Sequence, residues 1–306
     1  MKIIYGVKNL KRKIMPTIIT VGIFDGVHIG HQAAIKELLK KAKEIKAIPT
    51  VVTFDPHPAK VLKGKESISM LSSLNHRLCL MENLGIELCL VIRFTKRFAG
   101  HDTKGFIQDI LLKRMNMKSL IVGEDFSFGE DNVHTKAALE KVSKEMGFKL
   151  YVVGLRKHNS RIISSSIIRH LIENGKLNSA SKLLGRPISI LGTVVRGRKR
   201  GRALGFRTAN IDPHHEAIPP SGVYAAYTRV GNRSYKAVLN IGRRPTFGEK
   251  DPSIEVHIFG INKNLYGKDL EVYFHKRLRP ERKFKSEDHL RSQIIKDAAL
   301  AKKLLA

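Results

Sequence analysis

The sequence has few cysteines, few acidic residues and no long hydrophobic run. Only two cysteines occur among 306 residues, Cys79 and Cys89, and they form no CxxC pair. A disulfide framework and a cysteine-based zinc site are therefore excluded. No apolar run approaches the roughly 18 residues that span a bilayer, and no signal-peptide core is present, so we expect a cytoplasmic protein. Hydrophobic residues still make up 42% of the chain, which is enough for a sizeable core.

The scarcity of acidic residues leaves a strong positive charge. Lysine and arginine number 56 against 27 acidic residues, which gives a formal net charge of +29 at pH 7. The excess is shared, since residues 1–185 carry +15 and residues 186–306 carry +14. Such a field attracts nucleotides, nucleic acids and anionic membrane surfaces, or it is a general surface feature of the organism's proteins. The charge alone does not decide between these interpretations.

The periodicity of the first half predicts a parallel sheet. Short β-branched runs alternate with amphipathic stretches, which is typical of βαβ units with helices on both faces of the sheet. Ligands of such sheets bind beyond the carboxyl ends of the strands. We expect strands at 17–22, 50–54, 88–92 and 119–122, and helices at 33–46, 72–84, 103–115 and 135–147.

The pattern changes after residue 164. Two short helices, at 164–174 and 178–184, end at glycines. Glycine-punctuated short strands follow, which favours a small antiparallel barrel, and the chain closes with an amphipathic helix. The expected strands are 189–195, 222–229, 234–241, 253–259 and 269–275, and the expected final helix is 286–305. We therefore predict two domains, 1–185 and 186–306.

The strongest local signal lies where the first strand meets the first helix. Residues 22–31 read GIFDGVHIGH. Backbone N–H groups at such a helix start form an anion site, and Gly30 lets the backbone approach a phosphate closely. His28 and His31 can donate hydrogen bonds to a phosphoryl group as its charge builds. This HxGH pattern resembles that of the nucleotidyltransferase superfamily, which moves AMP from ATP to an acceptor. The alternative is two surface histidines near a helix N-terminus.

Three other segments of the first half follow predicted strands or open a helix. DPHP at 55–58 and GEDFSFG at 123–129 lie beyond the second and fourth strands, where each borders a ligand or forms an ordinary turn. Ser164, Ser165 and Ser166 open a helix that carries Arg169. The hydroxyls, the helix dipole and the guanidinium together suit a triphosphate, whereas a plain helix cap needs one serine.

The second half offers oxygen ligands and a carboxylate. A highly basic loop is spaced by Gly197, Gly201 and Gly205. Thr208 and Asn210 follow it and can supply oxygen ligands to a hydrated Mg²⁺ already held by phosphates. Glu255 lies in the middle of a strand with apolar residues on either side. It either faces solvent or enters a cleft as a general base.

As an ordered set, these segments resemble the bacterial bifunctional riboflavin kinase/FAD synthetase family over nearly the whole chain. The set is far more specific than any one of its members. It comprises GxFDGxHxGH at 22–31, DPHP at 55–58, GxDFxFG at 123–129, ISSSxxR at 163–169, LGRP at 184–187, GFxTAN at 205–210, GVY at 222–224, NIGxRPTF at 240–247, ExH at 255–257, LYG at 265–267 and RPExKF at 279–284.

The resemblance implies an α/β nucleotidyltransferase domain with a Rossmann-like parallel sheet, followed by a small antiparallel β-barrel riboflavin kinase domain with a C-terminal helix. It also implies two reactions that consume ATP with Mg²⁺. The barrel would phosphorylate riboflavin to FMN with Glu255 as general base. The first domain would adenylylate FMN to FAD, with His28 and His31 stabilising the transition state.

The resemblance further implies binding residues and partners. The adenylyltransferase ATP would contact Phe24, Asp25, Gly26, His28, Gly30, His31, Asp125, Ser164, Ser165 and Arg169. The flavin would contact Phe54, Asp55, Pro56, His57 and Phe126. The kinase ATP would contact Gly197, Gly201, Gly205, Thr208 and Asn210, the last two holding Mg²⁺ with the phosphates. We expect only small-molecule substrates as partners, with weak self-association, no membrane and no specific nucleic acid.

The chain departs from the family pattern at a few positions. Ile23 stands where the family has Asn, and Asn132 and His134 stand where it has Arg and Gly. Arg207 replaces a proline that fixes φ ahead of the magnesium ligands, which loosens that turn. These changes motivate a second hypothesis, an enzyme with one working half. A third, a nucleic-acid-binding protein on a retired enzyme scaffold, rests on charge alone, since no RNA-binding or helix-turn-helix motif supports it.

Overall fold

The computed structural model describes most of the chain, and contacts divide it into two compact units. The first unit is Met1–Ile68 with Leu74–Ser165, and the second is Ser69–Ser73 with Ser166–Ala306. The described residues are 1–10, 14–62, 69–100, 102–126, 136–197, 205–214, 216–231, 233–242 and 253–306. Some sequence predictions lie outside them, namely those on residues 127–129, Asn132, His134, Gly201 and 244–247.

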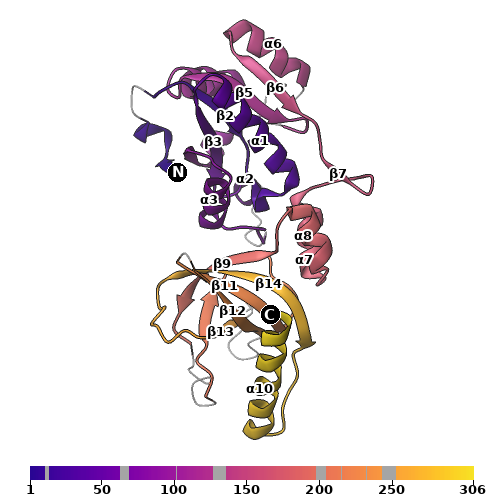
Figure 1. The fold of residues 1–306 in the computed structure, drawn as a ribbon. Helices are drawn as coiled ribbons and strands as arrows, with labels where there is room; N and C mark the ends of the chain where they lie inside the picture. Colours follow the sequence, from indigo (N-terminus) through magenta and orange to yellow (C-terminus); the bar gives the residue numbers. More distant parts are fainter. Residues whose placement is uncertain are drawn as a thin grey trace. The chain divides into compact units, whose positions relative to one another are not determined.

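The first unit is built on a six-stranded parallel sheet with the order β1-β4-β3-β2-β5-β6 (Figure 1). The four predicted strands are confirmed, and two edge strands were missed. The missed strands are short, with four and five residues, and lie at the two edges of the sheet, where most of their residues are exposed or half-exposed. The strands are β1 Lys2–Tyr5, β2 Thr17–Val21, β3 Ile48–Asp55, β4 Leu88–Arg93, β5 Met117–Gly123 and β6 Lys149–Val153.

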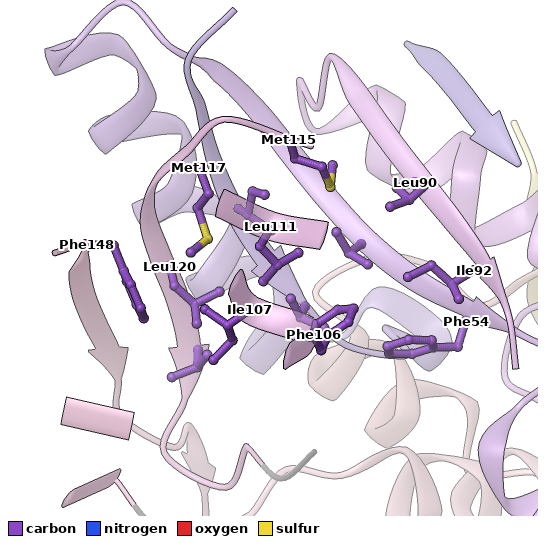
Figure 2. Close-up of a cluster of buried hydrophobic side chains, with 14 of the residues drawn as sticks. Phe54, Leu90, Ile92, Phe106, Ile107, Leu111, Met115, Met117, Leu120 and Phe148 are labelled. Carbon is purple, nitrogen blue, oxygen red and sulfur yellow. The ribbon is translucent and has the colours of Figure 1, made fainter. Parts of the chain in front are cut away.

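Helices cover both faces of this sheet, as predicted. On one face, α1 (Ile29–Glu44) and α3 (Leu74–Asn83) bury apolar side chains against alternate residues of the strands. On the other face, a π-helical turn, η3 (Phe106–Leu112), and α6 (Lys136–Met146) pack over the second set of alternate residues (Figure 2). The central strands are therefore buried on both sides, and only their ends are available to a ligand.

Shorter elements complete the first unit. The predicted helix at 103–115 is a short α5 that runs into η3, and Asp102 caps it by accepting from two backbone N–H groups. The remaining elements are the 3₁₀ turns η1 Val7–Asn9 and η2 Asp25–Val27, the helices α2 Pro58–Leu62, α4 Lys96–Ala99 and α5 Thr103–Gly105, and the hairpin strands β7 Lys157–His158 and β8 Arg161–Ile162.

The second unit is a closed antiparallel barrel with the order β10-β13-β12-β11-β14-β9, again as predicted. Figure 1 shows α10 (Glu287–Leu304) alongside the barrel, with its N-terminus capped by Ser286. The missed strand, β10, has only four residues. The other elements are α7 Ser165–Glu173, α8 Leu177–Leu184, β9 Ser189–Val195, β10 Ala209–Asp212, β11 Gly222–Val230, β12 Arg233–Gly242, β13 Ser253–Ile258 and β14 Asp269–Pro280.

A short segment from the first third of the sequence packs within the second unit. The backbone of Met70 pairs with that of Glu216, and Ala217 donates to the Met70 carbonyl at 2.6 Å. The carboxylate of Glu216 is buried and accepts from the backbone N–H of Ser73 at 2.7 Å and of Leu191 at 3.2 Å. These two donors compensate for burying a charge. The barrel unit is thus completed by residues 69–73.

Candidate active sites

The first candidate site lies at the point where the strand order of the parallel sheet reverses. β2 has β3 and β4 on one side and β5 and β6 on the other. In open α/β sheets the crevice outside the carboxyl ends of the strands at such a point is where ligands bind. The predicted GxFDGxHxGH, DPHP and GxDFxFG segments follow β2, β3 and β5 respectively. The topology therefore places three of the predicted segments at the same edge of the sheet.

The turn between β2 and α1 has an unusual backbone. Phe24, Gly26 and Val27 all have positive φ, at 55°, 76° and 41°. A left-handed conformation costs about 1–2 kcal/mol at a residue other than glycine, and most of all at a β-branched one. Phe24 and Val27 are both buried, so packing holds the turn in this shape. Further support comes from the Ser165 hydroxyl, which donates to the Asp25 carbonyl at 2.9 Å.

His28 and His31 lie against each other at the start of α1. Their rings are stacked with centroids 3.7 Å apart, and the edge of Phe24 contacts His31 at 5.2 Å. Gly30 makes room for this pair, because a Cβ there would lie 3.1 Å from the His28 ring. The structure thus gives a second reason for a glycine at position 30, namely space for the His28 ring, besides the predicted approach of a phosphate.

The environment keeps His31 neutral. Burial, followed by the charges of His28 and Arg77, holds the pKa of His31 well below its usual 6.5. A neutral imidazole has one N–H donor and one acceptor nitrogen. Within the described part of the chain, the buried Nδ1 of His31 has no hydrogen-bond partner. This nitrogen of His31 can therefore bind a phosphoryl group without first giving up a protein hydrogen bond.

The other predicted residues of the first unit differ in how they are placed. Asp25 is buried in the turn, and Ser164 and Ser165 are half-buried at the start of α7. Arg169 follows Ser165 by four residues in α7, which puts the two on one helix face. Asp125 is exposed, and its carboxylate folds back to within 2.8 Å of where a Gly123 Cβ would be.

The predicted flavin residues fall into two groups. Phe54 is only 4% exposed and packs against Phe94 in the core shown in Figure 2, and Phe126 is half-buried beside the same core. Asp55 and Pro56, joined by a cis peptide bond, are exposed. His57 accepts the backbone N–H of Ala59 through Nδ1 at 3.0 Å. The structure does not gather all five on one surface, and their contact with flavin stays a prediction.

Sequence reasoning missed Arg77, which the structure places beside this site. Its side chain in α3 is 2% exposed and donates to the carbonyl of Ile23 through Nη1. The sequence did hold a signal, because Arg77 stands between Leu74 and Met81 on the apolar face of the predicted helix. A charged residue in such a stripe needs a buried partner.

The second candidate site lies on the outside of the barrel. Asn210 of β10, Glu255 of β13 and Asn240 of β12 face one another directly across three neighbouring strands. Side chains opposite each other in this way have Cβ atoms about 5 Å apart. Their row continues to Val223, which packs under Ala301 of α10, so the row faces outward. Glu255 is half-buried there. Its sequence pattern left two alternatives, a solvent-facing side chain and one that enters a cleft, and half-burial lies between them.

A separate pocket of about 320 Å³ is lined by residues of β9, β10 and β13 that alternate with those of the row, and by residues 207–208 and 261–266. Its wall includes Thr208 from the segment that leads into β10. Asn262 contacts the side chain of Arg207, and the Arg207 carbonyl accepts from His257 Nδ1 at 2.8 Å. The pocket is lined by Val194, Arg207, Thr208, Ala209, Val256, Ile258, Ile261, Asn262, Lys263, Asn264, Leu265 and Tyr266.

The glycines predicted to bind the kinase nucleotide have different surroundings. Gly197 lies directly against Asn210, since a Cβ there would be 2.0 Å from Nδ2. Gly205 has a φ of 86°, which requires glycine, and has open space around it within the described chain. Gly197 thus adjoins Asn210, and Asn210 faces Glu255, whereas the pocket beside Thr208 is lined by other residues.

A parallel sheet with a histidine pair at its ligand-binding edge, joined to a closed barrel with a polar outer row, defines a two-part enzyme of nucleotidyl and phosphoryl transfer. The FAD synthetase family matches residues 10–167, and the riboflavin kinase family matches residues 184–305. The chain belongs to the bifunctional riboflavin kinase/FMN adenylyltransferase family. The resemblance and the fold predicted from the sequence are both confirmed.

Individual relatives support this assignment over nearly the full length. A bifunctional riboflavin kinase/FMN adenylyltransferase of Buchnera aphidicola (subspecies Schizaphis graminum) is 35% identical, covering 99% of this chain and 98% of the relative. The Bacillus subtilis enzyme of the same name is 37% identical, covering 94% and 92%. A crystal structure from Streptococcus pneumoniae, described as a macrolide-efflux protein, aligns with a TM-score of 0.84 and 28% identity over 99% of both chains. In this chain, no helix within the described ranges has the length and apolar character needed to span a membrane.

Proposed function

We propose that this chain makes FAD from riboflavin in two steps, each consuming ATP. The riboflavin 5′-hydroxyl attacks the γ-phosphorus of ATP, giving FMN and ADP. The FMN phosphate then attacks the α-phosphorus of a second ATP, giving FAD and pyrophosphate. The observation that carries this proposal is the tandem family match, FAD synthetase over 10–167 and riboflavin kinase over 184–305. We assign adenylylation to residues 1–185 and phosphorylation to residues 186–306.

For adenylylation, the histidine pair would bind the phosphoryl group that reacts. His31 is neutral, so it donates a hydrogen bond without carrying a proton into the reaction. The helix start of α1 adds backbone N–H groups, and Phe24, Asp25 and Gly26 shape the turn beneath them. Ser164, Ser165 and Arg169 would hold the departing pyrophosphate, Asp125 would contact the nucleotide, and residues 54–57 with Phe126 would border the flavin.

For phosphorylation, Glu255 would accept the proton of the riboflavin hydroxyl. Its position opposite Asn210 on one strand and Asn240 on the other supports this role, because amide side chains at these positions can hydrogen-bond a carboxylate or a substrate hydroxyl. Mg²⁺ would enter with ATP as part of the substrate, and the oxygens of Thr208 and Asn210 fit the few protein ligands that hydrated Mg²⁺ takes. Gly197, Gly201 and Gly205 would border the phosphates.

The same proposal extends to surroundings and partners. We place both reactions in the cytoplasm and name riboflavin, FMN and ATP as the partners of the chain. The net charge of +29 favours anionic substrates in general. Weak self-association, and the lack of a membrane or specific nucleic-acid partner, stay predictions.

The test is chromatographic product analysis of the pure protein incubated with riboflavin, ATP and Mg²⁺. We expect FMN to appear first and FAD to follow. FMN without FAD, together with no FAD when FMN itself is supplied, would instead establish the one-half enzyme motivated by Ile23, Asn132 and His134. FAD from supplied FMN but no product from riboflavin would support the one-half enzyme in its other form, with the barrel inactive, as the substitution at Arg207 suggests. Neither product from either flavin would contradict the proposed function.

A further inference from the structure

An arginine is buried under the first candidate site. Arg77 belongs to α3, which covers one face of the parallel sheet, and its side chain is 2% exposed. Its neighbours Leu78 and Met81 are buried in the apolar cluster on that face. A guanidinium does not lose its proton in proteins, so this is a permanent positive charge in an apolar setting. Such a group is retained only where its contacts compensate for the loss of water.

The partners of Arg77 lie at the ends of the two strands that lead into the site. Nη1 donates to the carbonyl of Ile23 and lies 3.5 Å from the Thr53 hydroxyl, which itself donates to the same carbonyl at 3.2 Å. Nη2 lies 3.9 Å from the carboxylate of Asp55. Ile23 precedes the strained turn of β2, and Asp55 ends β3. One side chain therefore joins the bases of the two loops that flank the crevice.

The charge of Arg77 also reaches the histidine pair. It lowers the pKa of His31 along with burial and His28, and it opposes the burial that raises the pKa of Cys89 on β4 to about 12. The resolved electrostatic influences on His31 come from His28, in the turn before α1, and from Arg77, in α3. The carboxylate of Asp55 lies within ion-pair distance of Arg77, at 3.9 Å.

We propose that Arg77 is a positioning residue of the adenylyltransferase: its buried cation joins the ends of β2 and β3 and provides a fixed positive charge beneath His28 and His31. The triphosphate and FMN are both anionic, and a preorganised cation stabilises charge that builds during their reaction. Arg77 acts through Ile23, Asp55 and His31 and does not itself touch the reacting atoms. The inference rests on the proposed FMN adenylylation.

Two substitutions test the charge of Arg77. Arg77→Lys keeps a cation, whereas Arg77→Gln removes the charge and leaves a shorter polar side chain. The control is Arg114→Met, which removes an exposed arginine of the same unit that donates to the Val7 carbonyl at 3.3 Å. Each purified variant is assayed for FMN to FAD and for riboflavin to FMN.

We expect Arg77→Gln to lower kcat for adenylylation about tenfold or more. Arg77→Lys should lose clearly less activity than Arg77→Gln, because it keeps the cation although a single ammonium does not replace the guanidinium fork. The kinase reaction, which we assign to the other unit, should be unchanged in all variants, and thermal melting followed by circular dichroism reports whether the first unit is folded. Three results would overturn the proposal: Arg77→Gln equal to the Arg114→Met control, Arg77→Lys as impaired as Arg77→Gln, or an equal loss of both activities in Arg77→Gln.

The pH dependence gives a readout that a purely structural role would not move. Removing the positive charge raises the pKa of His31, so the acid limb of kcat/KM for FMN should shift to higher pH in Arg77→Gln and stay in place in Arg77→Lys. Titration of the His31 ring by NMR follows the same group directly. An unmoved acid limb and His31 titration in Arg77→Gln would refute the electrostatic role. If wild-type protein makes no FAD from FMN, the proposed function fails instead, and the two failures are distinct.

Discussion

Replacing Gly197 by alanine should disable riboflavin phosphorylation while leaving adenylylation intact. The added methyl would lie 2.0 Å from Nδ2 and 2.4 Å from Cγ of Asn210, whereas ordinary contact begins near 3.4 Å. The Asn210 amide is buried on β10, opposite Glu255, and has little room to retreat. To restore contact distance the amide must move by about 1.4 Å, which takes it away from its proposed place on Mg-ATP.

The size of the effect follows from that displacement. A misplacement of about 1 Å at a reacting centre costs about 10²-fold in rate, which corresponds to about 3 kcal/mol in the activation free energy. Overpacking itself costs about 1–3 kcal/mol of stability. We therefore expect a kinase kcat reduced about 100-fold, with only a modest decrease in melting temperature.

Both reactions are measured on the same purified variant by separating FMN and FAD chromatographically. Gly154→Ala is the matched control, because in the described chain a Cβ at Gly154 would meet no heavy atom within 4 Å. It should leave both activities at the wild-type level. A Gly197→Ala protein that phosphorylates riboflavin within about threefold of wild type would refute the reasoning. So would an equal loss of phosphorylation and adenylylation.

Three further predictions concern the two sites and the barrel. Glu255→Gln should abolish riboflavin phosphorylation and spare adenylylation, and His31→Ala should do the reverse; if either change removed both activities from folded protein, the two-site assignment would be wrong. Asp297→Ala should lower the free energy of unfolding by about 3 kcal/mol in urea titrations. The Arg279 guanidinium, which lies 2.8 Å from Asp297 and is largely buried, would lose its carboxylate partner. An unchanged urea midpoint would contradict this. The folded-state pKa of His31 lies below 6.5, so the unfolded chain binds the proton first as the pH falls. The free energy of unfolding should therefore decrease below pH 6.5, and it should decrease less steeply in His31→Ala. Equal slopes for the wild type and His31→Ala would disprove this.

The central strands could be predicted from the sequence because burial on both faces leaves a continuous apolar run. All five residues of β2 are buried, and the predicted strand at 17–22 differs from it by one residue. Edge strands β1 and β6 are short and mostly exposed or half-exposed, so they lack the burial on both faces that marks the central strands, although their residues are typical of strands. β10 was missed because four residues after a basic glycine loop give too short a pattern for any period to show.

The site could be predicted only where its chemistry is local in sequence. The histidine pair stands within one turn, and the family motif exposed it. The role of Arg77 depends on Ile23 and Asp55, 54 and 22 positions away in the chain, so no window of the sequence contains it. The positive φ of Val27 was also beyond reach, because residue type argues against that conformation. The outward direction of Glu255 became clear only from its pairing with Asn210 and Asn240.

The insertion of residues 69–73 into the barrel unit has a consequence for protein synthesis. Ser73 and the Glu216 carboxylate that accepts its N–H are 143 residues apart. At about 5–20 residues per second, a ribosome needs on the order of 10 s to add the missing partner. Met70 and Leu71 are both buried in the finished protein. During that interval they lack their partner from the barrel unit, whereas the strands on either side of them, β3 and β4, can already pair with each other. The second unit therefore makes its contacts with a segment that was translated well before the barrel strands.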